Sequence, residues 1–494
     1  MPYIIAIDQG TSSSRCVLYN EQAQPIAVAQ REFTQIYPQP GWVEHDAEEI
    51  WQTQSAVFAE LLQKQKLKAE DIAGIGITNQ RETTVIWYRK TGIPIHNAIV
   101  WQDRRTADSC EKLKQSGYET LIQNKTGLLI DPYFSATKIQ WLLDHVEGAR
   151  QLAERGELAF GTMDTWLSWQ LSGGKLHITD VSNASRTMLY NINDLCWDME
   201  LLELFNIPAS LLPSVKSSSE IYGLTAHNEI GLNIPIAGIA GDQQAALFGQ
   251  LCHQPGMAKC TYGTGSFLMM NTGAQLVKSH HRLLTTIAWQ RGDQVTYALE
   301  GSVFMGGAVM QWLRDGLLVF KQASDSEALA ESVADNGGVY FVPALTGLGA
   351  PHWDSSARGA IFGITRGTTQ AHLTRAALES IAFQVDELLQ TLSDDCGAPI
   401  AELHVDGGAA KNNLMVQFQA DISRINIIRP KNLESTALGA AYLAGLAVGF
   451  WSFESINRTQ EIDQRFAPLM PSDQVENLKY YWQKAVVRTK AWME

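Results

Sequence analysis

Short apolar runs that end in glycine, hydroxyl or acidic residues recur along the chain. Residues 3–7 and 72–77 are nearly continuous apolar stretches, as in buried strands, and residues 16–19 resemble the second arm of a hairpin with the first. Residues 236–240 and 403–406 repeat this pattern in the second half. Helical segments separate the runs, so the pattern predicts an α/β fold with functional groups on loops beyond the strand ends.

Four segments have helical character. Residues 46–51 open a helix with an acidic first turn, and helical stretches follow the later strands at 245–252 and 413–421. The longest apolar stretch, 437–451, is rich in Ala and Gly and, at fifteen residues, short for a membrane span. We expect it to be a closely packed buried helix.

Three glycine-and-hydroxyl segments lie far apart in the sequence. They are Asp8-Gln9-Gly10-Thr11-Ser12-Ser13-Ser14-Arg15, Gly263-Thr264-Gly265-Ser266 and Asp406-Gly407-Gly408-Ala409-Ala410-Lys411-Asn412. Glycine allows close approach of the backbone to a phosphate, and small hydroxyl residues add donors. One such turn is usually an ordinary loop, but three of them predict a nucleotide site built between two domains.

Length, composition and charge limit the possible classes of protein. A chain of 494 residues exceeds the usual size of one core, and we expect a domain boundary near residue 250. The 38 basic and 52 acidic residues give a net charge of −14, which argues against general binding to nucleic acid or anionic membranes. The six cysteines form no metal-binding or disulfide pattern, and no signal peptide is evident, so we expect a cytoplasmic protein.

The common nucleotide and metal motifs are missing. The sequence has no G-x-x-x-x-G-K-[ST] loop, no G-x-G-x-x-G fingerprint and none of the protein-kinase motif set. H-E-x-x-H is also absent, and the eleven histidines form no metal-binding cluster. These absences argue against the usual phosphate-binding loops and against a zinc hydrolase.

Longer motifs carry a resemblance to a known family. Residues 133–142 (YFSATKIQWL) and 359–364 (GAIFGI), the latter continuing to His372-Leu373 and 376–379, resemble the two signatures of the FGGY carbohydrate kinases of the actin-like ATPase superfamily. The segments 79–84, 101–106 and 241–250 resemble the family members that phosphorylate glycerol more than the sugar kinases. The resemblance implies two actin-like (ribonuclease H-like) domains around an active-site cleft. It assigns residues 1–249 to polyol and phosphate binding and residues 250–494 to adenine nucleotide binding.

This resemblance implies ATP-dependent phosphorylation of glycerol to glycerol 3-phosphate. Asp242 is the expected base at the reacting hydroxyl and also a substrate contact. Arg81 offers only donors and Glu82 mainly accepts, so the two suit vicinal hydroxyls, although an Arg-Glu dipeptide alone is usually a solvated surface pair. The other expected substrate contacts are polar, from Tyr133 and Gln243, and apolar, from Trp101 and Phe267.

The same resemblance implies sites for ATP and Mg²⁺. The transferring phosphates are expected at Thr11, Ser12, Ser13 and Arg15, with Thr264 from the second domain. Asp8 is expected to act on Mg²⁺ through water. The adenosine and α-phosphate positions match Gly307, Gln311, Gly408 and Asn412. Close helix packing at Gly307 and a helix start at Asn412 are the structural alternatives.

Other functions and the regulation stay open at this stage. A family kinase for another polyol or sugar is one alternative, and an actin- or chaperone-like ATPase switch is a more distant one. In well-known bacterial relatives a Gly- and Arg-containing loop binds fructose bisphosphate, whereas residues 225–233 here contain no arginine and carry Glu229. We therefore expect weak inhibition by that effector. The family often forms dimers and tetramers, but no interface is predicted here.

Overall fold

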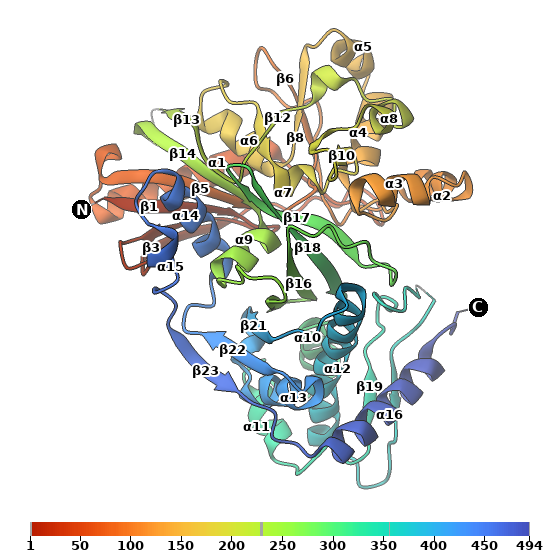
Figure 1. The fold of residues 1–494 in the computed structure, drawn as a ribbon. Helices are drawn as coiled ribbons and strands as arrows, with labels where there is room; N and C mark the ends of the chain where they lie inside the picture. Colours follow the sequence, from red (N-terminus) through yellow and green to blue (C-terminus); the bar gives the residue numbers. More distant parts are fainter. Residues whose placement is uncertain (1, 228–230, 355, 494) are drawn as a thin grey trace.

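The computed structural model describes residues 2–227, 231–354 and 356–493. Glu229, in the segment that was compared with the effector loop of bacterial relatives, lies outside the described residues. Figure 1 shows two lobes, one built mainly from the N-terminal half and the other mainly from the C-terminal half, each around its own sheet. Strands and helices alternate through both, which confirms the predicted α/β class.

The first sheet contains the predicted strands at residues 3–7, 16–19, 72–77 and 236–240. β1 pairs antiparallel with β2 and parallel with β5, which in turn pairs parallel with β14. This arrangement confirms the predicted hairpin and brings the carboxyl ends of three strands to one edge. In spatial order the strands are β13 (Ser219–His227), β14 (Gly231–Gly241), β5 (Ile72–Asn79), β1 (Tyr3–Gln9), β2 (Ser13–Tyr19) and β3 (Pro25–Glu32).

The second sheet repeats the plan of the first. β15 pairs antiparallel with β16 and parallel with β21, and β21 pairs parallel with β22. In this plan β15 corresponds to β1 and β21 to β5. The spatial order is β17 (Leu284–Arg291), β18 (Gln294–Val303), β16 (Ser266–Gly273), β15 (Ala258–Tyr262), β21 (Glu402–Asp406), β22 (Asn426–Pro430) and β23 (Ile462–Phe466).

The remaining elements surround these sheets. The helices of the first half are α1 (Ala47–Gln65), α2 (Ala107–Gln115), α3 (Glu119–Thr126), α4 (Ser135–His145), α5 (Ala149–Glu154), α6 (Met163–Leu171), α7 (Val181–Ala184), α8 (Met199–Leu204) and α9 (Asp242–Gly249). Those of the second half are α10 (Ala308–Asp315), α11 (Asp325–Glu331), α12 (Gln370–Cys396), α13 (Asn413–Ser423), α14 (Ser435–Ala447), α15 (Phe453–Ile456) and α16 (Ser472–Thr489). Short strand pairs are β4 (Glu44–His45) with β7 (Ala98–Ile99), β6 (Val85–Tyr88) with β8 (Leu158–Gly161), β9 (Ile178–Asp180) with β12 (Ser214–Lys216), β10 (Tyr190–Asn191) with β11 (Cys196–Trp197), and β19 (Tyr340–Val342) with β20 (Ala360–Phe362).

Two of the predicted helix starts are correct and one is displaced. Asp46 caps α1 by accepting hydrogen bonds from the backbone of Glu48 and Glu49, and α13 starts after Asn412 as expected. The helix expected over 245–252 instead spans Asp242–Gly249. It begins directly at the end of β14, with an acidic first residue that suits the positive end of the helix dipole.

Helix α14 is the buried, closely packed helix predicted from the Ala- and Gly-rich stretch. Although it belongs to the C-terminal half, it packs against β1, β5 and β14 of the first sheet and against α9. A Cβ on Gly439 would lie 1.8 Å from the Ala245 carbonyl oxygen, and one on Gly76 would lie 2.1 Å from that of Ala440. The small residues therefore allow backbone-to-backbone contact that joins the two halves.

This contact makes Gly439 sensitive to added volume. Gly439→Ala is expected to lower the free energy of unfolding by about 1–3 kcal/mol, because the backbones of α9 and α14 must separate. Chemical denaturation measures the change. Gly367→Ala is the matched control, since its nearest neighbour would lie 3.9 Å away. Equal stability of the two variants would contradict the close-packing explanation.

Two further sequence expectations concern cysteines and membrane spans. All six cysteines are free in the structure. Across the described residues, none of the helices combines the length and the apolar character needed to cross a bilayer.

Candidate active site

The carboxyl ends of β1, β5 and β14 bring three predicted site segments together. Asp8 lies opposite Thr78 in the parallel register, and Gly241 lies opposite Asn79. Arg81 therefore follows β5, which lies between the other two strands, and Asp242 follows β14. The arrangement is the expected one, because parallel strands end at the same edge of a sheet.

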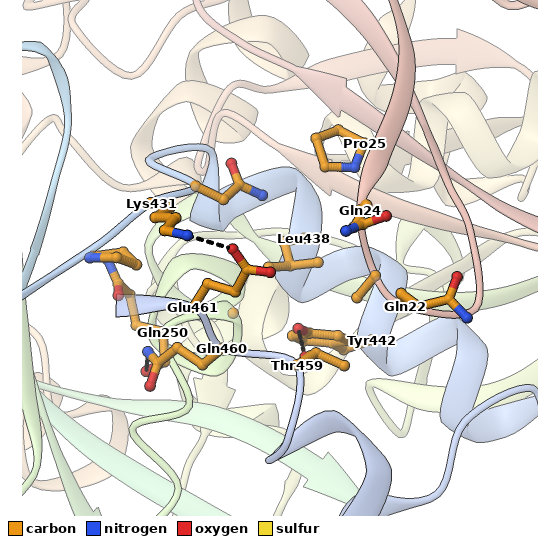
Figure 2. Close-up of a pocket in the computed structure, with 14 residues that line it drawn as sticks. Gln22, Gln24, Pro25, Gln250, Lys431, Leu438, Tyr442, Thr459, Gln460 and Glu461 are labelled. Atoms are coloured by element: carbon orange, nitrogen blue, oxygen red, sulfur yellow. Dashed lines mark hydrogen bonds and ion pairs between the residues drawn. The ribbon is translucent and has the colours of Figure 1, made fainter. Parts of the chain in front are cut away.

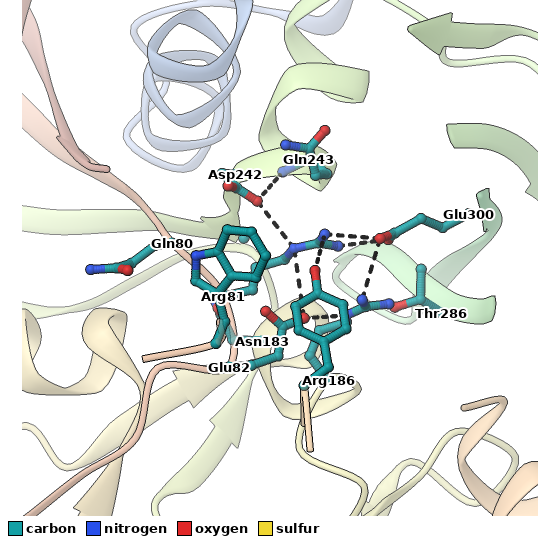
Figure 3. A network of polar contacts seen from close by, with 12 residues as sticks. Gln80, Arg81, Glu82, Asn183, Arg186, Asp242, Gln243, Thr286 and Glu300 are labelled. Atoms are coloured by element: carbon teal, nitrogen blue, oxygen red, sulfur yellow. Dashed lines mark hydrogen bonds and ion pairs between the residues drawn. The ribbon is translucent and has the colours of Figure 1, made fainter. Parts of the chain in front are cut away.

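Arg81 lies at the centre of a buried polar network (Figure 3). Its Nε lies 3.1 Å from Oδ1 of Asp242, and its two terminal nitrogens lie 2.6 and 2.9 Å from the carboxylate oxygens of Glu300. Arg81 is 3% exposed and Glu300 is 1% exposed. The bidentate pair fixes the plane of the guanidinium group, so its Nε edge is held toward Asp242.

Glu82 is held by a second buried arginine rather than mainly by Arg81. Arg186 Nε donates to Glu82 Oε1 at 2.7 Å, whereas the nearest nitrogen of Arg81 lies 3.9 Å from that oxygen. Arg186 also reaches Glu300 at 3.3 Å. Glu82 adopts a positive φ of 60°, an uncommon backbone conformation for a non-glycine residue. The Arg81-Glu82 dipeptide is therefore a buried, constrained pair and not a solvated one.

Glu300 and Arg186 are site residues that the sequence argument missed. Glu300 lies in β18 of the second sheet, so its ion pair with Arg81 connects the two lobes. A single acidic residue within the apolar run 297–303 was the available signal. Arg186 follows the short helix α7, where the sequence offers no comparable signal.

The pKa values of the buried carboxylates Glu300 and Glu82 are shifted in opposite directions. Burial alone would raise the pKa of Glu300, but Arg186 and Arg81 together lower it to about 2. At Glu82, burial prevails over the same two arginines and raises the pKa above its usual value. Glu300 is therefore the firmly ionised member that balances the arginines.

Aromatic side chains border the polar network. Trp101 lies edge-on to Tyr133 with ring centroids 5.6 Å apart, and its indole nitrogen donates to Thr11 Oγ1 at 3.0 Å. Tyr133 accepts a 3.3 Å hydrogen bond from Arg81 through its hydroxyl. Phe267 lies on β16 of the second sheet, opposite Thr261. The predicted substrate residues Arg81, Trp101 and Tyr133 thus adjoin each other, and Phe267 comes from the other lobe.

Gln243 connects the network to β15. Its backbone nitrogen donates to Oδ1 of Asp242 at 2.7 Å, and its side-chain oxygen accepts a hydrogen bond from Lys259. Lys259 is fully buried and also donates to Thr261 at 2.9 Å. Sequence reasoning did not select this lysine, although a charged residue within the strand 258–262 was a visible irregularity.

The first glycine-and-hydroxyl segment forms a tight turn between β1 and β2. The backbone nitrogen of Gly10 donates to the Ser13 carbonyl oxygen at 3.0 Å, so Thr11 and Ser12 form the tip of the turn. Ser13 Oγ accepts from Gln30 at 2.9 Å. Arg15 lies on β2 opposite Asp8, and its Nη1 lies 2.6 Å from Glu434.

The second and third segments lie beside each other on the second sheet. The backbone nitrogen of Gly307 donates to the Gly263 carbonyl oxygen at 2.8 Å, which brings the start of α10 onto the Thr264 loop. A Cβ on Gly407 would lie 2.6 Å from the Tyr262 carbonyl oxygen. Gln311 is exposed on α10, one turn beyond Gly307.

The structural alternatives for two nucleotide candidates hold as local descriptions. Gly307 is closely packed against Gly263, where an added Cβ would lie 2.8 Å from the carbonyl oxygen. Asn412 caps α13 by accepting from the Met415 backbone at 2.9 Å, and Gly408 begins the short 3₁₀ turn before it. A Cβ on Gly408 would meet nothing within 4 Å, so this side of the turn has room for a ligand.

Ionic and hydrogen-bond contacts connect the first segment with the third. Glu434 pairs with Arg15, and the next residue, Ser435, donates to Asp406. Segments that are hundreds of residues apart in the sequence thus lie close together.

Asp8 has the electrostatic setting of a cation contact. The pKa of its carboxyl is raised to about 6, chiefly by burial; Asp242 and Glu434 also raise it, while Arg15 lowers it. A divalent cation would favour the ionised form and relieve this repulsion. Among the described residues, no group of three or more His, Cys, Asp and Glu side chains could hold a metal ion. The Asp8 carboxylate is the kind of ligand that Mg²⁺ takes in proteins together with water and phosphate oxygens.

A separate cavity of about 300 Å³ lies where the two halves join (Figure 2). The turn between β2 and β3, the end of α9 and part of α14 line it, and the Lys431–Glu461 ion pair borders it at 2.9 Å. None of the predicted site residues contributes to its lining.

Family models and relatives agree on the nature of the chain. Residues 3–249 match the N-terminal domain, and residues 258–448 the C-terminal domain, of the FGGY family of carbohydrate kinases. Glycerol kinases of Koribacter versatilis (strain Ellin345) and Parabacteroides distasonis are each 60% identical to it, over the whole of this chain and 99% of theirs.

Solved structures confirm the fold class. The crystal structure of Plasmodium falciparum glycerol kinase with ADP is 39% identical, with a TM-score of 0.94 over 99% of this chain and 98% of that one. A xylulose kinase from Lactobacillus acidophilus, at 23% identity and a TM-score of 0.88, shares the fold over 98% of each chain. The two-domain actin-like architecture and the family resemblance are both confirmed. The chain therefore belongs to the FGGY family of carbohydrate kinases, within its group of glycerol kinases.

Proposed function

We propose that this protein transfers the γ-phosphoryl group of ATP to a terminal hydroxyl of glycerol, forming sn-glycerol 3-phosphate. The observation that carries the proposal is the buried network of Arg81, Glu82 and Asp242 beside the Trp101–Tyr133 wall. Donors, acceptors and an aromatic face in one small site match a short polyol. The names of the full-length relatives at about 60% identity support the same substrate.

In this proposal Asp242 accepts the proton of the attacking hydroxyl. Its side chain is 34% exposed at the start of α9, so one carboxylate oxygen can face the cleft while Oδ1 is held by Arg81 and by the Gln243 backbone. Arg81 and Gln243 donate to substrate oxygens, and Glu82 accepts from a substrate hydroxyl. Trp101, Tyr133 and Phe267 contact the carbon backbone, and Tyr133 adds a hydroxyl contact. Oriented binding of this kind brings the alcohol in line with the γ-phosphate.

ATP would occupy the cleft between the lobes. Thr11, Ser12, Ser13 and Arg15 would bind the transferring phosphates from the first sheet, and Thr264 would bind them from the second. Gly307, Gln311, Gly408 and Asn412 would contact adenosine and the α-phosphate. Asp8 would hold Mg²⁺ through water, and the ion would neutralise charge on the phosphates. The Plasmodium falciparum enzyme with ADP supports an adenine nucleotide as the second ligand.

We further propose that residues 1–249 and 250–494 act as the two domains, with the polyol side in the first and the adenine side in the second. The end of the matching N-terminal family domain at residue 249 supports this division. A cytoplasmic location and a homo-oligomeric state complete the proposal. Light scattering of the purified protein would test the oligomeric state.

Domain closure should accompany binding of both substrates. An open cleft would let water compete with the alcohol for the γ-phosphate, so we expect glycerol together with a non-hydrolysable ATP analogue to reduce the radius of gyration. Small-angle X-ray scattering with and without saturating ligands measures this change. An unchanged radius of gyration would contradict closure.

A substrate panel tests the proposed function. ADP formation is measured with Mg-ATP and glycerol, xylulose, gluconate or other small polyols at equal concentrations. The proposal predicts that glycerol gives the highest kcat/KM. Preference for another acceptor would move the assignment within the family, and ADP formation that needs no acceptor would favour the switch-ATPase alternative.

A further inference from the structure

Lys259 is a buried cation at the junction of the two lobes. It lies in β15 of the second sheet with 0% of its surface exposed. Its ammonium group donates to the side-chain oxygen of Gln243 on α9 and to Thr261 Oγ1 at 2.9 Å. A lysine is rarely buried without charge partners, because removing an ammonium group from water is costly.

The charges around Lys259 explain why it is tolerated there. Burial lowers its pKa, while the carboxylates of Asp406 and Asp242 oppose that shift and Arg81 reinforces it. The carboxylates come from the ends of β21 and β14, so both sheets contribute to the environment of this ammonium group. Lys259 thus contacts the candidate substrate residue Gln243 while keeping carboxylates nearby.

The chemistry of the contact fixes the orientation of the Gln243 carboxamide. An ammonium group has three donors and no acceptor, so the carboxamide must present its oxygen to Lys259. The NH₂ group of Gln243 then points the other way and has no hydrogen-bond partner among the described residues. A carboxamide that is free to flip could offer either its oxygen or its NH₂ group to a ligand.

We infer that Lys259 is a positioning residue, which locks the Gln243 carboxamide so that only its NH₂ group faces the polyol. The inference rests on the proposed function, since it assigns a direction to one contact of the same site. The substrate oxygen beside Gln243 must therefore accept a hydrogen bond. Its own proton is directed toward a carboxylate such as Glu82 or Asp242.

Replacement of Lys259 tests this role. Lys259→Met keeps the length and apolar stem but removes the donor. The KM for glycerol is expected to rise about tenfold, the scale of one lost charge-assisted hydrogen bond, with a smaller change in kcat and an unchanged KM for ATP. Thr261→Val is the matched control, because it removes the other acceptor and keeps the contact with Gln243; its KM for glycerol should change by less than about threefold.

A double-mutant cycle separates positioning from a merely structural role. In a Gln243→Ala background, Lys259→Met should raise the KM for glycerol little further, because Lys259 acts through the missing carboxamide. Fully additive effects would overturn the inference. A rise in the KM for ATP alone would also overturn it, because that result would place Lys259 on the nucleotide.

A second variant keeps the test decisive if Lys259→Met does not fold. Gln243→Glu retains a partner for Lys259 but replaces the NH₂ donor by an acceptor, so the KM for glycerol should rise by at least the same factor. A KM equal to that of the wild type would overturn the inference. Failure of the wild type to phosphorylate glycerol would instead refute the proposed function, so the two failures are distinguishable.

Discussion

Replacing Asp242 with asparagine is expected to reduce kcat for glycerol phosphorylation by about 10²- to 10⁴-fold, the usual contribution of a general base. The substitution keeps the size of the side chain and its position at the start of α9, but the amide cannot accept the hydroxyl proton. The KM for ATP should stay near the wild-type value. Steady-state assays at saturating glycerol and Mg-ATP measure the effect.

A matched control separates the loss of the base from a general effect of the substitution. Asp473→Asn makes the same chemical change at an exposed position in the first turn of α16. This helix belongs to the C-terminal lobe, whereas Asp242 follows a strand of the first sheet. Its kcat should equal that of the wild type. If Asp242→Asn also kept wild-type turnover, Asp242 would not be the base.

Replacing Glu300 with glutamine is expected to lower the free energy of unfolding by about 3–5 kcal/mol, the usual effect of breaking a buried ion pair. Glu300 is the carboxylate that both Arg81 and Arg186 contact, at 2.6 and 3.3 Å, so its neutralisation leaves two buried cations with less compensation. Chemical denaturation of the variant and the wild type measures the difference. Glycerol binding should weaken as well, because the Arg81 guanidinium loses its bidentate partner.

The control for this prediction is an ion pair at the surface. Glu454 pairs with Arg458 on exposed side chains, so Glu454→Gln should change the free energy of unfolding by less than about 0.5 kcal/mol. Similar small changes in both variants would mean that the buried network does not stabilise the junction between the lobes.

The pKa of Glu300 gives this stabilisation a pH dependence. The folded-state pKa of about 2 lies below the ordinary value of 4.5, so folding favours the ionised form. The contribution of Glu300 to stability is therefore fully present above pH 4.5 and is lost as the pH falls toward 2. Between those pH values, Glu300→Gln should lose less stability than the wild type on acidification.

Features encoded by neighbouring residues were predictable from the sequence. The β1–β2 hairpin, the capped start of α1 and the buried helix α14 each depend on local composition and spacing, and the structure has all three. The start of α9 was misplaced by three residues, because the apolar pattern does not reveal that the helix begins at the strand end.

Long-range partners explain what the sequence did not reveal. Arg81 and Glu300 are 219 positions apart and belong to different sheets, so neither residue indicates the other in the sequence. Arg186 is likewise recognised only by what it contacts after folding, and the charge of Lys259 within an apolar strand does not indicate that it contacts Gln243. The family resemblance named residues expected to contact ligands, whereas the buried partners of those residues became visible only in the structure.

The most direct test of the account is transfer of labelled phosphate from [γ-³²P]ATP to glycerol, with Mg²⁺, by the wild-type protein. We predict that the label appears in glycerol 3-phosphate in step with ADP release, and that ADP release without glycerol is far slower. ADP release at the same rate without glycerol, and with no labelled glycerol 3-phosphate, would contradict the central claim that this cleft is a glycerol-phosphorylating site.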